Sequence, residues 1–166
     1  MHEHSIELLN KAVADELSAV HQYMYFHFHC DDQGFDLLAQ LFKRTSIEEM
    51  THVEMLAERI LFLGGDVEME LADPVNAEKD VEKMLTIARG MEEQSVMDYN
   101  KWANECAKNN DSASKKLFEN LVDDEERHYD QYDDEIDNVE RFGDRYLALQ
   151  SIERSKNVSS GGGGEE

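Results

Sequence analysis

A Glu-x-x-His motif occurs twice in this sequence, as EMTH at residues 49–52 and as EERH at residues 125–128. Residues three positions apart share one face of a helix, so each motif presents one carboxylate and one imidazole to a common point. Both motifs interrupt apolar stripes with a repeat of three or four residues, which is the pattern of a helix face that packs into a core. A buried carboxylate without a partner is destabilising or changes its protonation state. The two motifs therefore indicate a group that compensates buried charge.

Two further glutamates lie in the same setting on two other segments. Glu16 and Glu92 each interrupt an apolar stripe at helical spacing. Together the four segments supply four inward carboxylates and two imidazoles, from Glu16, Glu49, His52, Glu92, Glu125 and His128. Four buried carboxylates repel one another, and two divalent metal ions would balance their charge. Oxygen ligands combined with imidazole suit iron or manganese, and helix bundles use this set of residues for di-iron carboxylate sites.

Four long helices would position these residues. Proline and glycine interrupt helices most strongly, and their scarcity leaves four uninterrupted segments at about 4–30, 36–63, 78–108 and 112–142. The connection at 66–78 is the longest and contains the single proline. At about 3.3 Å per residue it could run the length of a helix of about 28 residues, so the third helix would run parallel to the second.

This connection predicts an all-α, ferritin-like four-helix bundle with one long crossover. A short fifth helix at the C-terminus would begin near Gly143. We expect residues 1–154 to form the bundle as one domain. Residues 155–166 have the composition of a flexible, Ser/Gly-rich acidic tail.

Composition limits the classes of function. The formal net charge is −22, which argues against sequence-independent binding to nucleic acid and suits a protein that attracts cations. No apolar run is long enough to cross a membrane, and the first residues lack the features of a signal peptide. Cys30 and Cys106 are too far apart in sequence to indicate a disulfide framework. A cytoplasmic protein without nucleic-acid or membrane partners is the expectation.

Three stretches resemble bacterioferritin: DELSAVHQY at 15–23, SIEEMTHVEMLAERILFLGG at 46–65 and DDEERHYDQY at 123–132. The resemblance extends over residues 4–154. It implies a hollow shell, usually of 24 subunits, that oxidises ferrous iron with oxygen or peroxide and stores ferric mineral inside. Similar proteins of the Dps type form shells of 12, and the fifth segment favours 24.

The resemblance also implies roles for single residues. Carried across motif by motif, it assigns the six residues Glu16, Glu49, His52, Glu92, Glu125 and His128 to the ferroxidase site, with Glu49 and Glu125 bridging two irons. Tyr23 would be a hydrogen-bonding or redox-active tyrosine beside the site. Met50 would be an axial ligand of a haem bound between two subunits, with a ferredoxin-type protein as electron donor. Met50 is turned by about 100° from Glu49 and so faces out of the bundle; the alternative is ordinary interface packing.

Other interpretations remain open at this stage. A soluble di-iron oxidoreductase that acts on a separate substrate would use the same ligands, although the two Cys-x-x-Cys motifs of rubrerythrin are absent from the sequence. A metal-free scaffold would leave four buried glutamates uncompensated. Glu48 is interpreted as a solvent-exposed acid, with transit iron binding as the alternative. Tyr99, Trp102 and Tyr129 are interpreted as packing residues.

Overall fold

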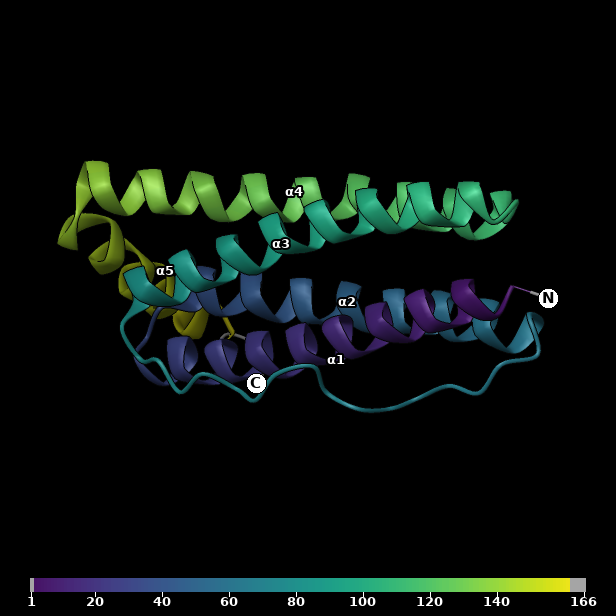
Figure 1. The fold of residues 1–166 in the computed structure, drawn as a ribbon. Helices are drawn as coiled ribbons and strands as arrows, with labels where there is room; N and C mark the ends of the chain where they lie inside the picture. Colours follow the sequence, from purple (N-terminus) through teal and green to yellow (C-terminus); the bar gives the residue numbers. More distant parts are fainter. Residues whose placement is uncertain (1, 162–166) are drawn as a thin grey trace.

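The computed structural model describes residues 2–161, and all regular secondary structure in this range is helical. Four long helices form the bundle and a fifth lies across one end (Figure 1). The elements are α1 (Glu3–Asp32), α2 (Asp36–Phe62), α3 (Val81–Lys108), α4 (Ser112–Phe142) and α5 (Asp144–Gly161). The predicted ferritin-like fold class is confirmed.

Local sequence explains where the helices begin and end. The Asp80 side chain accepts a hydrogen bond from the Lys83 amide and caps α3, and Asp111 caps α4 in the same way through the Ser114 amide. The chain leaves α2 at Gly64, where φ is +81°. This left-handed conformation costs glycine little because it has no Cβ.

The crossover between α2 and α3 runs along α1 for most of the bundle length (Figure 1). Side chains of α1 form hydrogen bonds with the backbone of the crossover at three points along it: Asn10 with Asp66, Ser18 with Ala72 and Gln22 with Asn76. Because the crossover returns to the end where α2 began, α3 runs parallel to α2, as the length of the connection predicts. The bundle thus consists of two helix hairpins, α1–α2 and α3–α4.

The apolar core divides into two clusters along the bundle axis. One is built around Tyr23, Phe42 and Tyr132 near α5, and the other around Tyr99 and Phe118 toward the opposite end. The six predicted site residues lie between these clusters and are nearly inaccessible to solvent. Low-dielectric walls on both sides strengthen electrostatic interactions between them.

The fifth helix is longer than the sequence predicts. It continues to Gly161 rather than ending at 154, with serine hydroxyls bonded to backbone carbonyls one turn earlier, as in Ser155 to Ser151. Within residues 2–161, the last hydrogen bond and ion pair between α5 and the bundle come from Arg154, which binds the Asp31 carbonyl oxygen at 2.7 Å and Asp36 at 3.5 Å. Residues 162–166 of the predicted tail lie outside the described part of the chain. None of the described helices has the length and hydropathy needed to span a membrane.

Candidate metal centre

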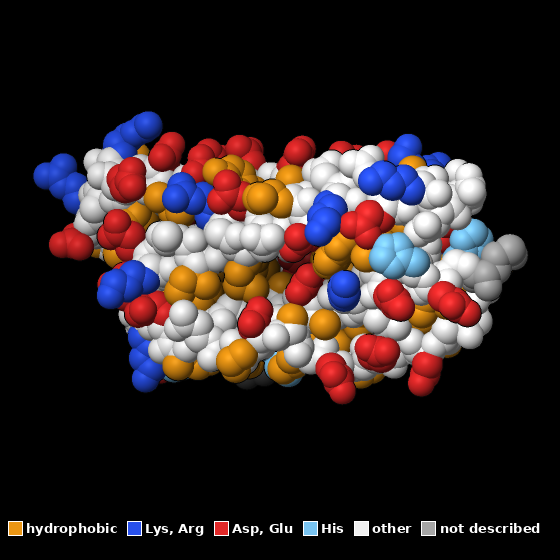
Figure 2. All heavy atoms as spheres, viewed as in Figure 1, with side chains coloured by type: hydrophobic (Ala, Val, Ile, Leu, Met, Phe, Trp, Pro, Cys, Tyr) orange, Lys and Arg blue, Asp and Glu red, His pale blue; other side chains and the backbone are white. Residues whose placement is uncertain are grey.

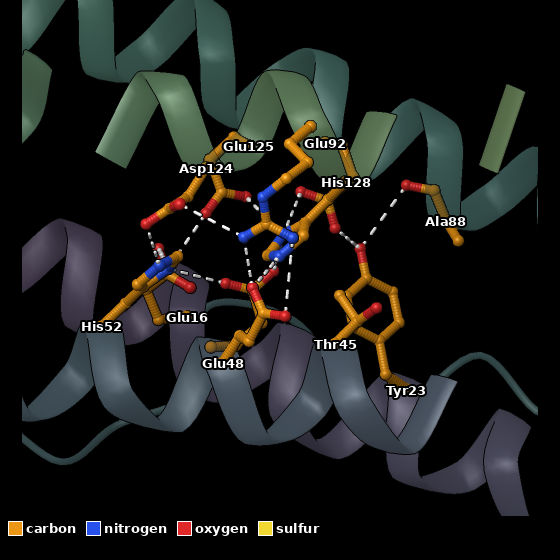
Figure 3. A network of polar contacts seen from close by, with 12 residues as sticks. Glu16, Tyr23, Thr45, Glu48, His52, Ala88, Glu92, Asp124, Glu125 and His128 are labelled. Atoms are coloured by element: carbon orange, nitrogen blue, oxygen red, sulfur yellow. Dashed lines mark hydrogen bonds and ion pairs between the residues drawn. The ribbon is translucent and has the colours of Figure 1, made fainter. Parts of the chain in front are cut away.

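The six predicted site residues converge from all four long helices, between the two apolar clusters. Figure 3 shows Glu16, His52, Glu92, Glu125 and His128 pointing toward one another. Each is at most 2% exposed. They form two overlapping groups whose potential ligand atoms lie within 4.8 Å of one another: Glu16, Glu49, His52 and Glu125, and Glu49, Glu92, Glu125 and His128. Glu49 and Glu125 belong to both groups. This arrangement provides two adjacent metal positions with two shared carboxylates.

The inner atoms of the site point at one another without forming hydrogen bonds. His52 Nδ1 lies 2.8 Å from Glu49 Oε2 and 3.0 Å from Glu125 Oε1, and His128 Nδ1 lies 3.2 Å from Glu49 Oε1. Both Nδ1 atoms and both oxygens of Glu49 lack a hydrogen-bond partner among the described residues. Buried polar atoms are almost always satisfied, so these atoms fit a site that is completed by bound cations.

The protonation of the metal-free site reflects crowded charge. Burial, followed by the charges of Glu16 and Glu92, raises the pKa of Glu49 well above its usual value, and burial raises that of Glu125 in the same way. Burial disfavours the charged form of His128, but Glu92 and the neighbouring carboxylates outweigh it and raise the His128 pKa to about 9. The centre therefore holds protons where divalent cations would supply positive charge.

Two outer carboxylates contact the histidines at Nε2, the ring nitrogen that faces away from the inner glutamates. His52 on α2 approaches Asp124 of α4 with Nε2 3.1 Å from Oδ2, and His128 on α4 approaches Glu48 of α2 with Nε2 2.8 Å from Oε2. An Nε2–H that donates to a carboxylate leaves Nδ1 free to bind a metal. The interpretation of Glu48 as a solvent-exposed acid missed this contact. The signal was available, because an acid directly precedes the glutamate of each Glu-x-x-His motif.

Two tyrosines hold the remaining carboxylates across the α1–α3 pair. The Tyr23 hydroxyl donates a hydrogen bond to Glu92, and the Tyr99 hydroxyl donates one to Glu16 at 2.6 Å. Tyr23 therefore lies beside the site as expected. Tyr99 packs against Trp102 and Phe118 as interpreted, but its contact with Glu16 was missed. Both tyrosines lie seven residues after a site glutamate.

A cavity of about 120 Å³ leads to the centre from the surface between α1, α3 and the crossover. Glu49, Glu92 and Glu125 line its inner part, and Asp15, Asp73 and Asp98 are among the residues nearer the surface. Acidic side chains lie at mid-length between α3 and α1 on this face (Figure 2). Burial, then the charges of Asp98, Glu16 and Asp73, raises the pKa of Asp15 to about 6. Such a negatively charged cavity attracts cations toward the centre.

Met50 lies away from this centre, as helix geometry predicts. Its side chain is 49% exposed on α2, and Ile47, one turn earlier, is equally exposed. A second apolar surface, on α1 and the crossover, includes Val20, Met24 and Phe28. These surfaces offer a thioether and apolar contacts outside the bundle core.

Comparison with known proteins gives consistent matches over most of the chain. Residues 6–142 match the Ferritin-like domain family. The bacterioferritin of Desulfovibrio desulfuricans is 34% identical over 86% of this chain and 80% of its own length, and that of Rhodobacter capsulatus is 34% identical over 87% and 89%. An X-ray structure of the Desulfovibrio desulfuricans bacterioferritin, described with its diiron site in different catalytic states, superposes with a TM-score of 0.87. It has 33% identity and covers 89% of this chain and 86% of that one.

Proposed function

The chain belongs to the bacterioferritin family, and from this premise we propose that it oxidises Fe(II) to Fe(III) at a di-iron site within each subunit. The ferric product is stored as mineral inside a hollow shell of its own copies. The observation that carries the proposal is the convergence of four buried carboxylates and two histidines, with inner atoms that lack hydrogen-bond partners in the described chain. Glu16, Glu49, His52, Glu92, Glu125 and His128 are the proposed iron ligands.

The chain's own residues prepare the centre for this reaction. Glu49 and Glu125 are shared by the two positions, so they would hold the two ions close together. Tyr23 and Tyr99 fix Glu92 and Glu16, while Asp124 and Glu48 fix the imidazoles. Bound iron would supply the electrons that reduce oxygen or peroxide. Carboxylate oxygens are hard ligands and favour Fe(III) over Fe(II), which promotes oxidation.

Substrate would reach the centre through the acidic cavity between α1 and α3. Asp15, Asp73 and Asp98 concentrate divalent cations near its surface, and Glu49 lines its inner part. The apolar clusters on either side keep the remainder of the bundle core closed to water. The cavity therefore supports a site that is supplied with ferrous iron from solution rather than one that is assembled around a permanently enclosed ion.

Haem binding between two subunits is part of the same proposal. Met50 would supply one thioether, with the equivalent methionine of a second copy as the other axial ligand. Its half-exposed position fits this role, because thioether ligands to haem iron must project beyond the bundle. The exposed side chain of Ile47 and the partly buried side chains of Val20 and Met24 fit a porphyrin or a second subunit. The bound haem would supply electrons for iron release, with a ferredoxin-type protein as donor.

We further propose a cytoplasmic shell of 24 copies, with 12 as the alternative. The fifth helix supports the larger number, because it adds a segment that packs across the end of the bundle. The formal charge of −22 per chain gives the assembled particle a strongly negative field that favours cation uptake.

Anaerobic titration of the metal-free protein with Fe(II), followed by oxygen, tests the proposal. The fast oxidation phase should saturate near two irons per subunit, about the capacity of one di-iron site, and slower uptake should continue beyond it. Glu49→Gln and His52→Ala should abolish the fast phase. Glu126→Gln is the matched control, because Glu126 neighbours Glu125 but is exposed.

The results of this titration distinguish iron storage from a di-iron oxidoreductase. Saturation near two irons without further uptake would exclude storage and favour a di-iron oxidoreductase with a separate substrate. Absence of a fast phase in the unaltered protein would show that the six residues do not form a ferroxidase site. Particle size, measured by light scattering on the same sample, distinguishes a shell of 24 from one of 12.

A further inference from the structure

Arg127 joins the two outer carboxylates of the candidate metal centre. Its guanidinium forms an ion pair with Glu48 across the α2–α4 boundary and lies 3.2 Å from Asp124 Oδ1 on its own helix. Glu48 is the carboxylate beside His128, and Asp124 is the carboxylate beside His52. One positive side chain is therefore in contact with the supports of both imidazoles.

The two carboxylates need such a partner to stay in place. Their side chains are about 40% exposed, so water competes for their oxygens, and like charge drives them apart. A guanidinium has several donors in a rigid planar arrangement and can serve two carboxylates at once. Without it, each carboxylate could turn toward solvent and leave the Nε2 atom of its histidine without a fixed acceptor.

Loss of that acceptor would also change the position of Nδ1, the ring nitrogen that faces the metal positions. The Nε2 contact selects the orientation and the tautomer of an imidazole that binds a metal through Nδ1. Both Nδ1 atoms lie within 3.2 Å of Glu49 oxygens, so a small ring rotation would change the ligand geometry at both metal positions. Arg127 could not be singled out from sequence alone, because it is exposed and lies at the edge of the apolar stripe, between Glu125 and His128.

We propose that Arg127 is a positioning residue of the di-iron site. By holding Glu48 and Asp124 together, it keeps His128 and His52 in their ligating orientations and couples the two metal positions. This inference rests on the proposed function, since it assumes that the six inner residues bind two ions. Arg127 itself contacts no metal position and acts through the outer carboxylates.

Co(II) binding to the metal-free full-length protein tests the role without oxidation chemistry. Isothermal titration would give affinity and stoichiometry, and the visible absorption of Co(II) would report ligand geometry. Arg127→Gln should weaken binding by about 10-fold, the lower end of the effect of losing an outer contact to a metal ligand, because Arg127 acts one contact further out. The change should also alter the Co(II) spectrum. Arg127→Lys retains the charge and should restore binding in part.

Arg89→Gln is the matched control. Arg89 forms a comparable ion pair with Asp133, at 2.6 Å between α3 and α4 and with similar exposure, and none of its ion-pair partners contacts a site histidine. The Arg89→Gln variant should bind Co(II) with the affinity and the visible spectrum of the unaltered protein. In a double-mutant cycle, Glu48→Gln should add little to Arg127→Gln, because both changes remove the same support.

The outcomes separate this inference from the proposed function. If the unaltered protein binds two Co(II) ions per subunit and Arg127→Gln binds them equally well, the positioning role is wrong and the di-iron site stands. Equal weakening by Arg89→Gln would also overturn the role, because it would indicate a general loss of bundle stability. If the unaltered protein binds no Co(II) pair while Glu49→Gln behaves identically, both the site and the role of Arg127 are wrong.

Discussion

Tyr99 and Glu16 are joined across the α1–α3 pair by a buried hydrogen bond of 2.6 Å. The same helices carry the reciprocal contact, in which Tyr23 of α1 donates to Glu92 of α3. The outer carboxylates repeat this exchange between α2 and α4, with Asp124 facing His52 and Glu48 facing His128. Each hairpin of the bundle therefore supplies supports for proposed iron ligands that the other hairpin carries. The site is therefore complete only when the two hairpins are packed against each other.

Replacement of Tyr99 by phenylalanine should weaken metal binding on the Glu16 side of the centre. The change removes the donor to Glu16 and keeps the ring that packs on Trp102 and Phe118. We expect about a tenfold loss of Co(II) affinity at one of the two positions, measured by isothermal titration. Tyr132→Phe is the control, because the Tyr132 hydroxyl is buried near the site without a hydrogen-bond partner in the described chain. Unchanged binding in Tyr99→Phe would show that Glu16 is held adequately by its own helix.

Replacement of Glu49 by glutamine should stabilise the metal-free protein and reduce the further stabilisation that bound metal provides. Burial and the charges of Glu16 and Glu92 raise the pKa of Glu49, so at pH 7 this carboxyl destabilises the metal-free fold relative to a neutral amide. The variant should therefore melt at a higher temperature than the unaltered protein when metal is absent. Co(II) should raise the melting temperature of the unaltered protein much more than that of the variant. Scanning calorimetry with and without Co(II) measures both, and a variant that melts lower in both states contradicts the prediction.

The predictable part of the centre is the part that local periodicity determines. Glu49 and His52 share a helix face because three residues separate them, and the surrounding apolar stripe specifies that this face is buried. Glu16 and Glu92 follow from the same stripes on the other helices. The crossover was predictable because chain length alone limits its path. These are properties of single helices or of one connection.

The unpredicted part depends on the register between helices. Tyr99 reaches a residue 83 positions away, and Arg127 reaches Glu48 over 79 positions. No single helix specifies these pairings, because a shift of one turn along either helix would create a different set of contacts. Glu48 and Arg127 also lie at the edge of the buried stripe, where polar residues are common for reasons of solubility alone. Their roles became visible only when the two hairpins were placed side by side.

Replacement of Asp111 by asparagine should lower stability in a pH-dependent manner, away from the metal centre. Burial opposes ionisation of Asp111, but the hydrogen bond from the Ser114 amide and the ion pair with Arg59 outweigh it and lower its pKa from 3.8 to about 2. Arg59 Nη2 lies 2.6 Å from Asp111 Oδ1, and the Asp111 side chain is 1% exposed. A pKa lowered by this amount corresponds to roughly 2 kcal/mol of stability at pH 7.

The sign follows from the lowered pKa in the folded state. The contribution of Asp111 is complete above its unfolded pKa near 4 and disappears as the pH falls through about 2. The difference between the unaltered protein and Asp111→Asn should therefore be constant from pH 7 to about pH 5 and shrink below pH 4. Urea unfolding of the metal-free protein measures it, with the exposed Asp130→Asn as control. A difference that stays constant at low pH would show that lost packing, rather than charge, destabilises the variant.

Truncation of the C-terminus should show where the bundle ends. A chain that stops after Arg154 keeps the contacts of this residue with Asp31 and Asp36, and the hydrogen bonds beyond it are local to α5. Its melting temperature should change by less than about 2 °C, as for other surface changes. A chain that stops after Leu149 also loses Gln150, which is buried and accepts a hydrogen bond from the Leu38 amide at 3.2 Å. Its free energy of unfolding should fall by about 1 kcal/mol or more. Equal stability of the two truncated chains would place the end of the bundle before Gln150.

Replacement of Met50 by leucine should separate haem ligation from interface packing. Leucine keeps a similar apolar volume but has no sulfur, so it preserves packing between subunits and removes the proposed axial ligand. Haem content per subunit after reconstitution with hemin, measured by absorbance, should fall to background, while particle size stays unchanged. Met97→Leu is the control, because Met97 is an exposed methionine on α3. If the unaltered protein and Met50→Leu take up equal amounts of hemin, Met50 is not a ligand. If instead neither binds haem and Met50→Leu alters particle size, Met50 is a packing residue between subunits, which is the alternative that the sequence left open.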